Sequence, residues 1–326
     1  MDVDDIERKH FMKTLAVFKY YRSYTLKKVS KQTEIYEKLS ERHKALIPDF
    51  LIAMQNIKKC IENNAFFISQ ILRNAKPDIF EGDHFLSNQN DAIENFVQSG
   101  VVNSQSDFAI TSSDLDKINS VLKQFVRDWS SVGVEERKQS YEPVLGEIKK
   151  LYWSSDRCKK VGEYTLHPWV TQFCNNMTRD NQTTAVTVPD VVPTDIPAGV
   201  QFSMVAGDFV EVYSEPESWD CVATVYFIDT AHNILDYLDT IWRILVPGGY
   251  WVNFGPLLYH FADVPGQDSI ELSYEELRKA IQLMGFEFVK EEVKIPSTFT
   301  QDPNSMLHYH YKCVLNVLRK PLNAEK

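Results

Sequence analysis

Hydrophobic residues recur at helical spacing over the first 150 positions of the chain. Apolar side chains at Phe11, Leu15 and Phe18 predict one long helix, and a second such pattern runs from Phe50 to Ile61. The clearest helix is expected at 114–130, where one apolar stripe consists of Leu115, Ile118, Leu122, Phe125 and Trp129. Another helix is expected from about 134 to 151, while the polar stretch 76–107 lacks periodicity and predicts a loop. We therefore predict an N-terminal all-α domain at residues 1–150.

The second half of the chain alternates between strand-like and helix-like segments. Residues that favour strands dominate 202–209, 221–228, 250–256, 287–295 and 308–318. Helices are predicted in the gaps at 230–244 and 273–284. Such alternation is typical of an α/β domain with a mostly parallel sheet, here at residues 151–326. Because the last two strand segments are adjacent in sequence, an antiparallel edge is expected.

Charge and composition narrow the choice of partners. The formal net charge of −10 and the pI near 5.4 argue against a nucleic-acid interface, which needs clustered Lys and Arg. The N-terminus is acidic, and no run of about 18 apolar residues occurs, so we expect neither a signal peptide nor a membrane span. A small or cationic partner fits the negative net charge better than a nucleic acid does. A homodimer is compatible with this expectation.

Cysteine and histidine usage predicts a reducing compartment and no bound metal. The five cysteines are odd in number, widely spaced and without a C-x-x-C pair, so neither a disulfide framework nor a zinc site is indicated. His308 and His310 share one face of an expected strand, but no third ligand stands near them in the sequence. We expect a location in the cytosol, with the nucleus as the alternative.

The stretch 219–261 is built like the C-terminal half of a class I methyltransferase sheet. It contains a strand, an amphipathic helix, a Pro-Gly-Gly turn and a second strand. None of the twelve glycines of the chain forms a G-x-G sequence, so the glycine-rich loop of a nucleotide-binding unit is absent. The sequence thus predicts a Rossmann-like sheet that is incomplete at its N-terminal half.

Several specific segments extend this similarity to one family. LKQFVRDWS at 122–130, LHPWVTQFCNN at 166–176, FIDTAHN at 227–233 and PGGYWVNFGPLLYHF at 247–261 resemble the carnosine N-methyltransferase family. The resemblance covers the chain from Glu7 to Pro321. It implies a methyl transfer from S-adenosylmethionine to the imidazole of carnosine, giving anserine, with carnosine as the small-molecule partner and no metal.

The resemblance also shows what this chain lacks. In the family, a strand, a glycine loop, a helix and a second strand ending in an acidic residue precede the segment that matches LHPWV. Only 48 residues, 154–201, are available here, whereas roughly 60 or more are needed at about 30 residues per βαβ unit. We infer an internal deletion of about 50 residues. Such a loop binds the negative end of a ligand, and the acidic residue binds its ribose. The methionine carboxylate and the ribose of S-adenosylmethionine are therefore expected to be unanchored here.

Asp229 is the candidate catalytic and substrate-binding residue. It follows the apolar strand 221–228, and open α/β sheets bind ligands at the carboxyl ends of their strands. A carboxylate on the far nitrogen of an imidazole fixes the tautomer and stabilises the cation formed by attack. The resemblance assigns this role to Asp229. The alternative is that Asp229 caps the helix beginning near Thr230.

Three further positions match substrate contacts of the family. His260 follows the next strand, although its spacing alone favours an ordinary core or surface histidine. Tyr311 matches a substrate-contacting tyrosine, with ordinary strand packing as the alternative. Phe299 stands where the family commonly has tyrosine, so one hydroxyl contact is missing or replaced.

Five positions are assigned to S-adenosylmethionine by the resemblance. Gln124 and Arg127 lie off the apolar stripe of their helix, where a solvated face is the default explanation, and Arg127 suits the methionine carboxylate. Asp208 and Phe209 match the adenine reader of this fold, with a turn aspartate as the alternative. Val225 replaces a cysteine that lines the adenine site.

Two hypotheses about function therefore remain. The first is an S-adenosylmethionine-dependent carnosine N-methyltransferase. The second is a catalytically inactive shortened variant that acts as an interaction or regulatory protein. The missing glycine loop is the feature that favours the second for this chain, and the matched segments favour the first.

Overall fold

The computed structural model describes residues 3–74, 112–151, 164–191, 200–205, 207–264 and 266–322. The loop predicted at 76–107 lies outside the described residues. The chain divides into two compact units, each built from separate stretches of sequence. Unit 1 consists of Met1–Val134, Arg157–Ala206 and Thr300–His308, and unit 2 of Glu135–Asp156, Gly207–Phe299 and Tyr309–Lys326. The division into an all-α domain at 1–150 and an α/β domain at 151–326 stays a prediction.

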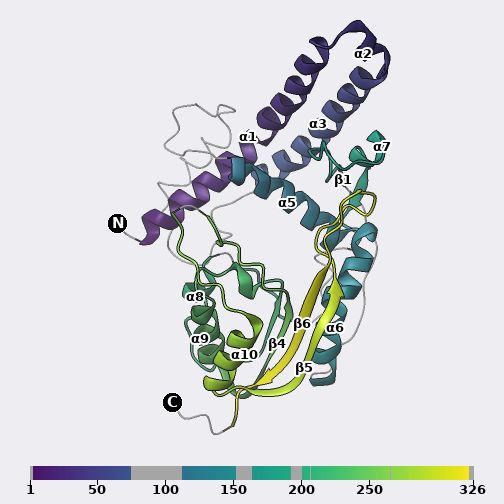
Figure 1. The fold of residues 1–326 in the computed structure, drawn as a ribbon. Helices are drawn as coiled ribbons and strands as arrows, with labels where there is room; N and C mark the ends of the chain where they lie inside the picture. The colour runs from purple at the N-terminus through teal and green to yellow at the C-terminus, as the bar shows by residue number, and fades with distance from the viewer. Residues whose placement is uncertain are drawn as a thin grey trace. The chain divides into compact units, whose positions relative to one another are not determined.

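Unit 1 is built mainly from helices (Figure 1). Its elements are α1 (Val3–Glu37), α2 (Glu41–Ala45), α3 (Phe50–Asn74), α5 (Ser112–Trp129), the 3-10 helix η2 (Ser131–Gly133), β1 (Tyr164–Leu166), α7 (Arg179–Gln182) and β2 (Val186–Val188). The helices predicted from the periodicity at Phe11, Phe50 and Leu115 are confirmed. The stripe of α5 is buried at Leu115 and Leu122, and the antiparallel pair of β1 and β2 joins the same core.

Unit 2 is an α/β unit. Its elements are α6 (Val134–Leu151), α8 (Phe209–Val212), β3 (Trp219–Val225), the 3-10 helix η3 (Ile228–Thr230), α9 (Ile234–Ile244), β4 (Leu245–Gly255), α10 (Tyr274–Leu283), β5 (Glu287–Ser297) and β6 (Tyr311–Arg319). The predicted helices at 230–244 and 273–284 are confirmed as α9 and α10. A capping box between Ser273 and Glu276 begins α10, as the sequence pattern S-x-x-E favours.

The sheet of unit 2 has the strand order β3-β4-β6-β5. β3 and β4 pair in parallel, and β6 is antiparallel to both β4 and β5. Three of the four strands therefore run in one direction, and the predicted α/β class with a mostly parallel sheet is confirmed. The antiparallel strand, expected at the edge, lies inside the sheet instead. Adjacency in sequence predicted that β5 and β6 pair. Hydrogen bonds between β6 and β4 place β6 between β4 and β5.

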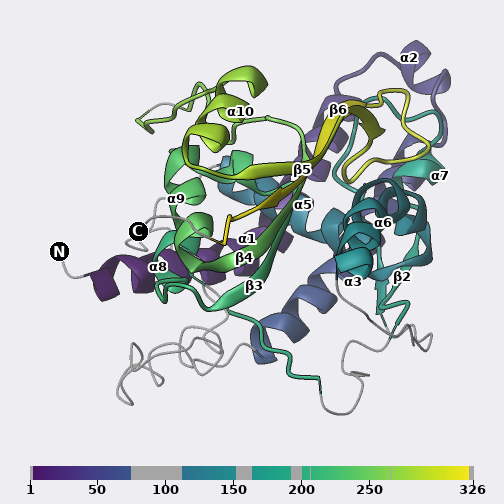
Figure 2. The same ribbon diagram turned by 90° about the horizontal axis from the view of Figure 1, so that it is seen from below.

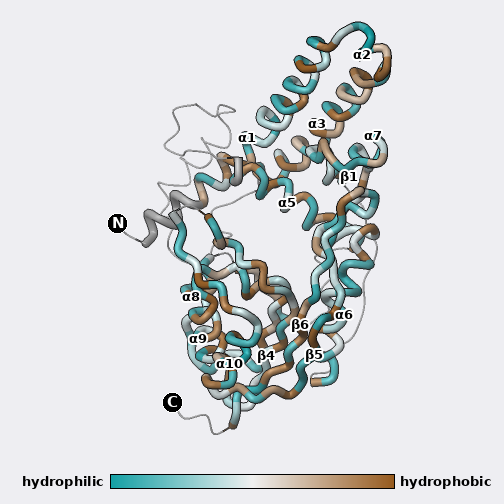
Figure 3. Tube along the Cα trace, in the orientation of Figure 1, coloured by the Kyte–Doolittle hydropathy of each residue, from teal (hydrophilic) through white to brown (hydrophobic). Residues whose placement is uncertain are grey.

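Helices cover both faces of this sheet (Figure 2). One face, with Trp251 and Leu318, packs against Leu238 and Ile241 of α9 and against α10. The opposite face, with Val252 and the other inward residues of β4 and β6, packs against α6. The hydrophobic colouring of the central strands follows from this double burial (Figure 3). Both faces being covered, a ligand reaches the sheet at the ends of its strands.

The strand predicted at 202–209 is wrong. Residues 201–205 form no regular structure, and Phe202 and Met204 are exposed. Asp208 instead begins the short helix α8, because its side chain accepts a hydrogen bond from the backbone N–H of Val210 at 2.8 Å. Strand-forming residue types alone were insufficient here, since a strand also needs a neighbour to pair with.

In the part of the chain that the structure describes, β3 is the last strand of the sheet on its side. Ala223, in the middle of β3, is exposed, and its neighbours Cys221 and Val222 are only partly buried. A complete class I sheet continues beyond this strand. The prediction of a sheet that is incomplete at its N-terminal half is confirmed for the described residues.

Candidate active site

Asp229 lies in η3, directly after the turn that ends β3. Its side chain is buried, with 3% of the residue exposed. One carboxylate oxygen, Oδ2, accepts a hydrogen bond from the backbone N–H of Leu258 at 2.8 Å. The interpretation of Asp229 as a helix cap is wrong, because Asn233 caps α9 through the N–H of Leu235. The carboxylate is thus held at the carboxyl edge of the sheet, with no role in capping.

The environment of Asp229 makes its charge costly. Burial raises the pKa of this carboxyl, and the N–H of Leu258 and the nearby His260 only partly oppose the effect. The other oxygen, Oδ1, accepts no hydrogen bond from any other residue in the described ranges. The backbone N–H of Asp229 itself also lowers this pKa, so the carboxylate is hydrogen-bonded by backbone N–H groups and keeps acceptor capacity for an N–H group brought by a ligand.

The loop after β4 brings His260 to Asp229. The backbone N–H of His260 donates to the carbonyl oxygen of Asp229 at 3.0 Å, so the two chain segments run side by side. The His260 side chain is exposed, which matches the surface position that spacing alone suggested. The hydroxyl of Tyr259 donates to the carbonyl of Leu272 at 2.8 Å and holds the same loop against the segment before α10.

Tyr311 opens β6 on the same side of the unit. Burial raises the pKa of its hydroxyl, and the negative charge of Asp229 raises it further. The antiparallel register of β4 and β6, in which Gly255 pairs with Val314, places the start of β6 at the end of β4, on the side of the sheet where Asp229 lies. Three residues predicted to contact substrate, Asp229, His260 and Tyr311, are therefore gathered at one end of the sheet.

Phe299 joins this group through Tyr226, a residue that was not predicted from the sequence. The ring of Tyr226 lies 4.7 Å from that of Phe299 and 6.0 Å from that of Tyr311, measured between centroids. The one signal available in the sequence was an aromatic residue three positions before Asp229, inside a run that read as continuous strand. The strand in fact ends at Val225.

The two predicted adenine contacts on α8 lie beside the chain that leads to Asp229. The Phe209 ring packs 5.2 Å from Phe227 and 5.1 Å from Tyr237. Asp208 is exposed, and its Oδ1 caps α8. Val225 packs with the core cluster that faces α6, whereas Phe209 packs with the cluster on the other face of the sheet. The structure therefore does not bring Val225 together with Phe209.

Gln124 and Arg127 belong to unit 1. Both are partly buried, so a fully solvated face does not describe them. The guanidinium of Arg127 donates to both carboxylate oxygens of Asp128, at 2.7 and 2.9 Å. The edge of the guanidinium formed by Nε and Nη2 is therefore already engaged by Asp128.

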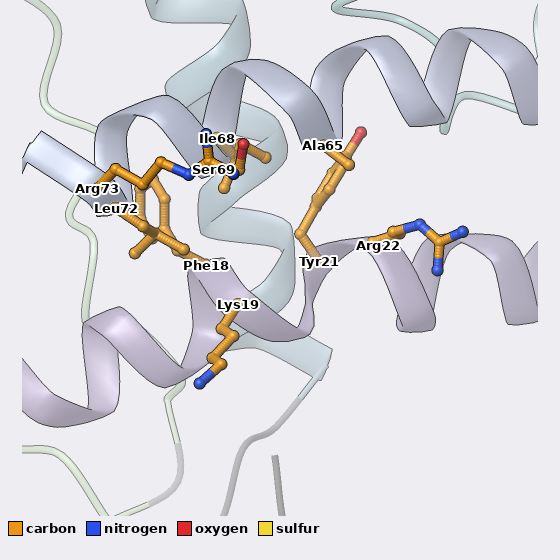
Figure 4. A pocket seen from close by; sticks show the side chains of 9 residues that line it. All are labelled: Phe18, Lys19, Tyr21, Arg22, Ala65, Ile68, Ser69, Leu72 and Arg73. Carbon is orange, nitrogen blue, oxygen red and sulfur yellow. The ribbon is translucent and has the colours of Figure 1, made fainter. Parts of the chain in front are cut away.

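A cleft of about 280 Å³ lies elsewhere, between α1 and α3 of unit 1 (Figure 4). Its apolar wall includes Phe18 and Leu72, and Arg22 at its rim is paired with Glu62. None of the predicted site residues lines it. Within the described ranges, no group of three or more His, Cys, Asp or Glu is arranged to hold a metal ion, and no helix is long and apolar enough to cross a bilayer.

Comparison with known proteins agrees with the motif-based resemblance. The profile of the family described as carnosine N-methyltransferase matches residues 104–161 and 155–322. Carnosine N-methyltransferases of Mus musculus and Rattus norvegicus are 37% and 36% identical to the chain, covering 98% of it and 88% of each relative. A solved SAM-dependent methyltransferase from Thermotoga maritima is 18% identical over 36% of the chain and 64% of its own, with a TM-score of 0.25, too low to support an argument.

The alignments also bear on the missing segment. The match to the Mus musculus relative extends over 367 positions, more than the 326 residues of the chain, so that relative carries residues inside the aligned region that this chain lacks. The two stretches matched by the family profile overlap at 155–161, next to the place where the glycine loop was expected. With the family profile matching most of the chain and the relatives nearly all of it, the chain belongs to the carnosine N-methyltransferase family and is a methyltransferase with an internal deletion.

Proposed function

We propose that the chain acts on the imidazole ring of carnosine and methylates one ring nitrogen, with S-adenosylmethionine as the methyl donor. The observation that carries the proposal is the Asp229 carboxylate, which is buried, has a raised pKa and, among the described residues, is hydrogen-bonded only by backbone N–H groups. Family membership supports the choice of carnosine, because the relatives carry that name.

The chemistry of the imidazole explains why this carboxylate matters. A free imidazole has a pKa near 6.5, so most of it is neutral at neutral pH and one nitrogen already has a free lone pair. The ring needs orientation more than deprotonation. Asp229 Oδ1 accepts the N–H of the far nitrogen, which turns the lone pair of the other nitrogen outward. When that nitrogen gains a methyl group the ring becomes cationic, and the buried negative charge stabilises it.

His260 and Tyr311 complete the substrate side of this proposal. His260, whose backbone is bonded to that of Asp229 and whose side chain is exposed, contacts the dipeptide backbone of carnosine in this proposal. Tyr311, coupled to the charge of Asp229, forms one wall for the imidazole, and Phe299 adds apolar surface. An apolar surround lowers the local dielectric and strengthens the hydrogen bond to Asp229.

The described residues suit the adenine end of the methyl donor better than its methionine end. Asp208 and Phe209 suit the adenine end, since a carboxylate oxygen and an aromatic ring lie at one helix start. The chain has no G-x-G loop for the methionine carboxylate, and Arg127 is engaged with Asp128. S-adenosylmethionine supplies a methyl group on a sulfonium centre when bound. What the described residues account for is the binding and orientation of the imidazole.

Two measurements on the full chain test this proposal. Carnosine binding is measured by ligand-observed NMR for the wild type, Asp229→Asn and Asp239→Asn. Asp239 is an exposed aspartate on α9 of the same unit and serves as the matched control. We expect Asp229→Asn to weaken binding at least about tenfold, because a hydrogen bond to a charged group is worth about 1.5–3 kcal/mol. Equal affinity in all three proteins would remove Asp229 from the substrate site.

Methyl transfer is followed separately, with labelled S-adenosylmethionine and detection of anserine. Formation of anserine supports the complete reaction. Binding of carnosine without transfer would instead favour the shortened, non-catalytic variant, because the substrate side would then be intact and the donor side not. Location in the cytosol or nucleus stays a prediction, which imaging of a tagged chain checks.

A further inference from the structure

Tyr226 occupies the turn between β3 and η3. It directly follows Val225, and its backbone N–H donates to the carbonyl of Phe254 at 2.8 Å. Its φ of 51° lies in the left-handed region, which a bulky residue rarely adopts. Such outliers persist only where the surroundings enforce them, and they gather at functional sites.

Gly255 makes this conformation accessible. A Cβ atom at Gly255 would lie 3.3 Å from both the Cα and the N of Tyr226, a distance tighter than ordinary packing. The end of β4 therefore approaches the left-handed turn closely because residue 255 has no side chain. The backbone of Tyr226 is therefore held between the end of β3, which it follows, and the end of β4 at Gly255.

The hydroxyl of Tyr226 is committed to the protein. It donates to Ser297 Oγ at 2.7 Å, lies 3.3 Å from the carbonyl of Thr298 and accepts from the thiol of Cys313 at 3.5 Å. Burial raises the pKa of this hydroxyl, so it stays protonated. These bonds tie the Tyr226 ring to the end of β5, directly before Phe299, and to β6, two residues after Tyr311.

The ring itself lies among residues of the proposed substrate site. It is tilted by 38° against Phe299 and stands nearly perpendicular, at 78°, to Tyr311. Behind it, Phe254 of β4 packs edge-on at 5.9 Å. Tyr226 is therefore in contact with two of the proposed substrate residues, while its own polar group faces the protein.

We infer that Tyr226 is a positioning residue for the imidazole site: its hydroxyl, anchored on Ser297, holds the rings of Phe299 and Tyr311 in the arrangement that accepts the imidazole beside Asp229. The inference rests on the proposed function. It assigns Tyr226 no proton transfer, since its hydroxyl stays protonated and internally bonded.

The test compares Tyr226→Phe and Ser297→Ala with Tyr274→Phe. Tyr274 is a matched control in the same unit, because its hydroxyl is also internally bonded, to Glu291 and Asn316. We expect Tyr226→Phe and Ser297→Ala each to weaken carnosine binding by about threefold to tenfold, with no further loss in the double variant. Tyr274→Phe should lower the melting temperature without changing carnosine affinity. Unchanged affinity in Tyr226→Phe, or additive losses in the double variant, would overturn the inference.

A second measurement needs no ligand and separates this inference from the proposed function. 4-Fluorophenylalanine is placed at position 299, and its ¹⁹F resonance is recorded in the wild-type background and with Tyr226→Phe or Tyr274→Phe. A shifted or broadened resonance with Tyr226→Phe alone supports the positioning role even if carnosine does not bind. A resonance that is the same in all three proteins shows that Tyr226 does not position Phe299.

Discussion

Replacement of Asp229 by asparagine is expected to stabilise the protein at neutral pH while it weakens substrate binding. Asparagine has the shape of a protonated aspartate, and its amide oxygen keeps the hydrogen bond from Leu258. Burial raises the pKa of Asp229, so the folded state prefers the uncharged form. The variant removes the cost of a charge that serves the ligand and not the fold, a stability–activity trade-off.

The magnitude follows from the link between pKa and stability. A carboxyl whose pKa is raised on folding contributes stability that is present below its unfolded pKa, about 3.9, and lost as the pH rises through the folded pKa. Each pKa unit by which folding raises the carboxyl corresponds to about 1.4 kcal/mol in the free energy of unfolding. The direction of this pKa change predicts a gain in the free energy of unfolding for Asp229→Asn at pH 7, and we expect it to fall in the range of about 0.5–2 kcal/mol that is usual for stabilising substitutions.

The assay is thermal unfolding of wild type, Asp229→Asn and the exposed control Asp239→Asn between pH 4 and pH 8. The melting temperature of Asp229→Asn relative to wild type should rise from about pH 4 upward and then level off. Asp239→Asn should follow the wild type throughout. A melting temperature of Asp229→Asn that falls relative to wild type as the pH rises from 4 to 8 would refute the reasoning, because the carboxylate would then stabilise the fold in its charged form.

Three further substitutions and one exposed control, Leu283→Ala, test the fold and the donor side. Gly133→Ala should destabilise the protein by about 1–3 kcal/mol in thermal unfolding, because its Cβ would lie 2.1 Å from the carbonyl oxygen of Arg127, and an unchanged melting temperature would contradict that close approach. Leu238→Ala should lower the free energy of unfolding by about 2–5 kcal/mol in denaturant titration, because Leu238 is fully buried. Leu283→Ala, at a leucine that is 78% exposed, should change it little, and equal losses in the two variants would contradict the assigned core. Arg127→Ala should raise the dissociation constant for S-adenosylmethionine in titration calorimetry by about tenfold, and an unchanged constant would leave Arg127 as a residue of the helix surface only.

The sequence by itself determined the helices. Their apolar residues repeat every three or four positions, and this local period produces one buried face whatever the tertiary arrangement. The stripe of α5 was readable in this way. The absence of a G-x-G loop was equally a property of the sequence, and so was Asp229 as a carboxylate placed after an apolar strand.

Only the tertiary structure decided the pairing of strands and the state of the site. The segment 202–209 has strand-like residues yet forms no strand, and β6 inserts between β4 and β5, because hydrogen bonds to distant segments set both outcomes. Likewise, the raised pKa of Asp229 depends on burial under a loop some thirty positions away in sequence. The left-handed turn of Tyr226 depends on Gly255 in a neighbouring strand. Local periodicity carries no information about such contacts, since they arise only when segments remote in sequence pack together.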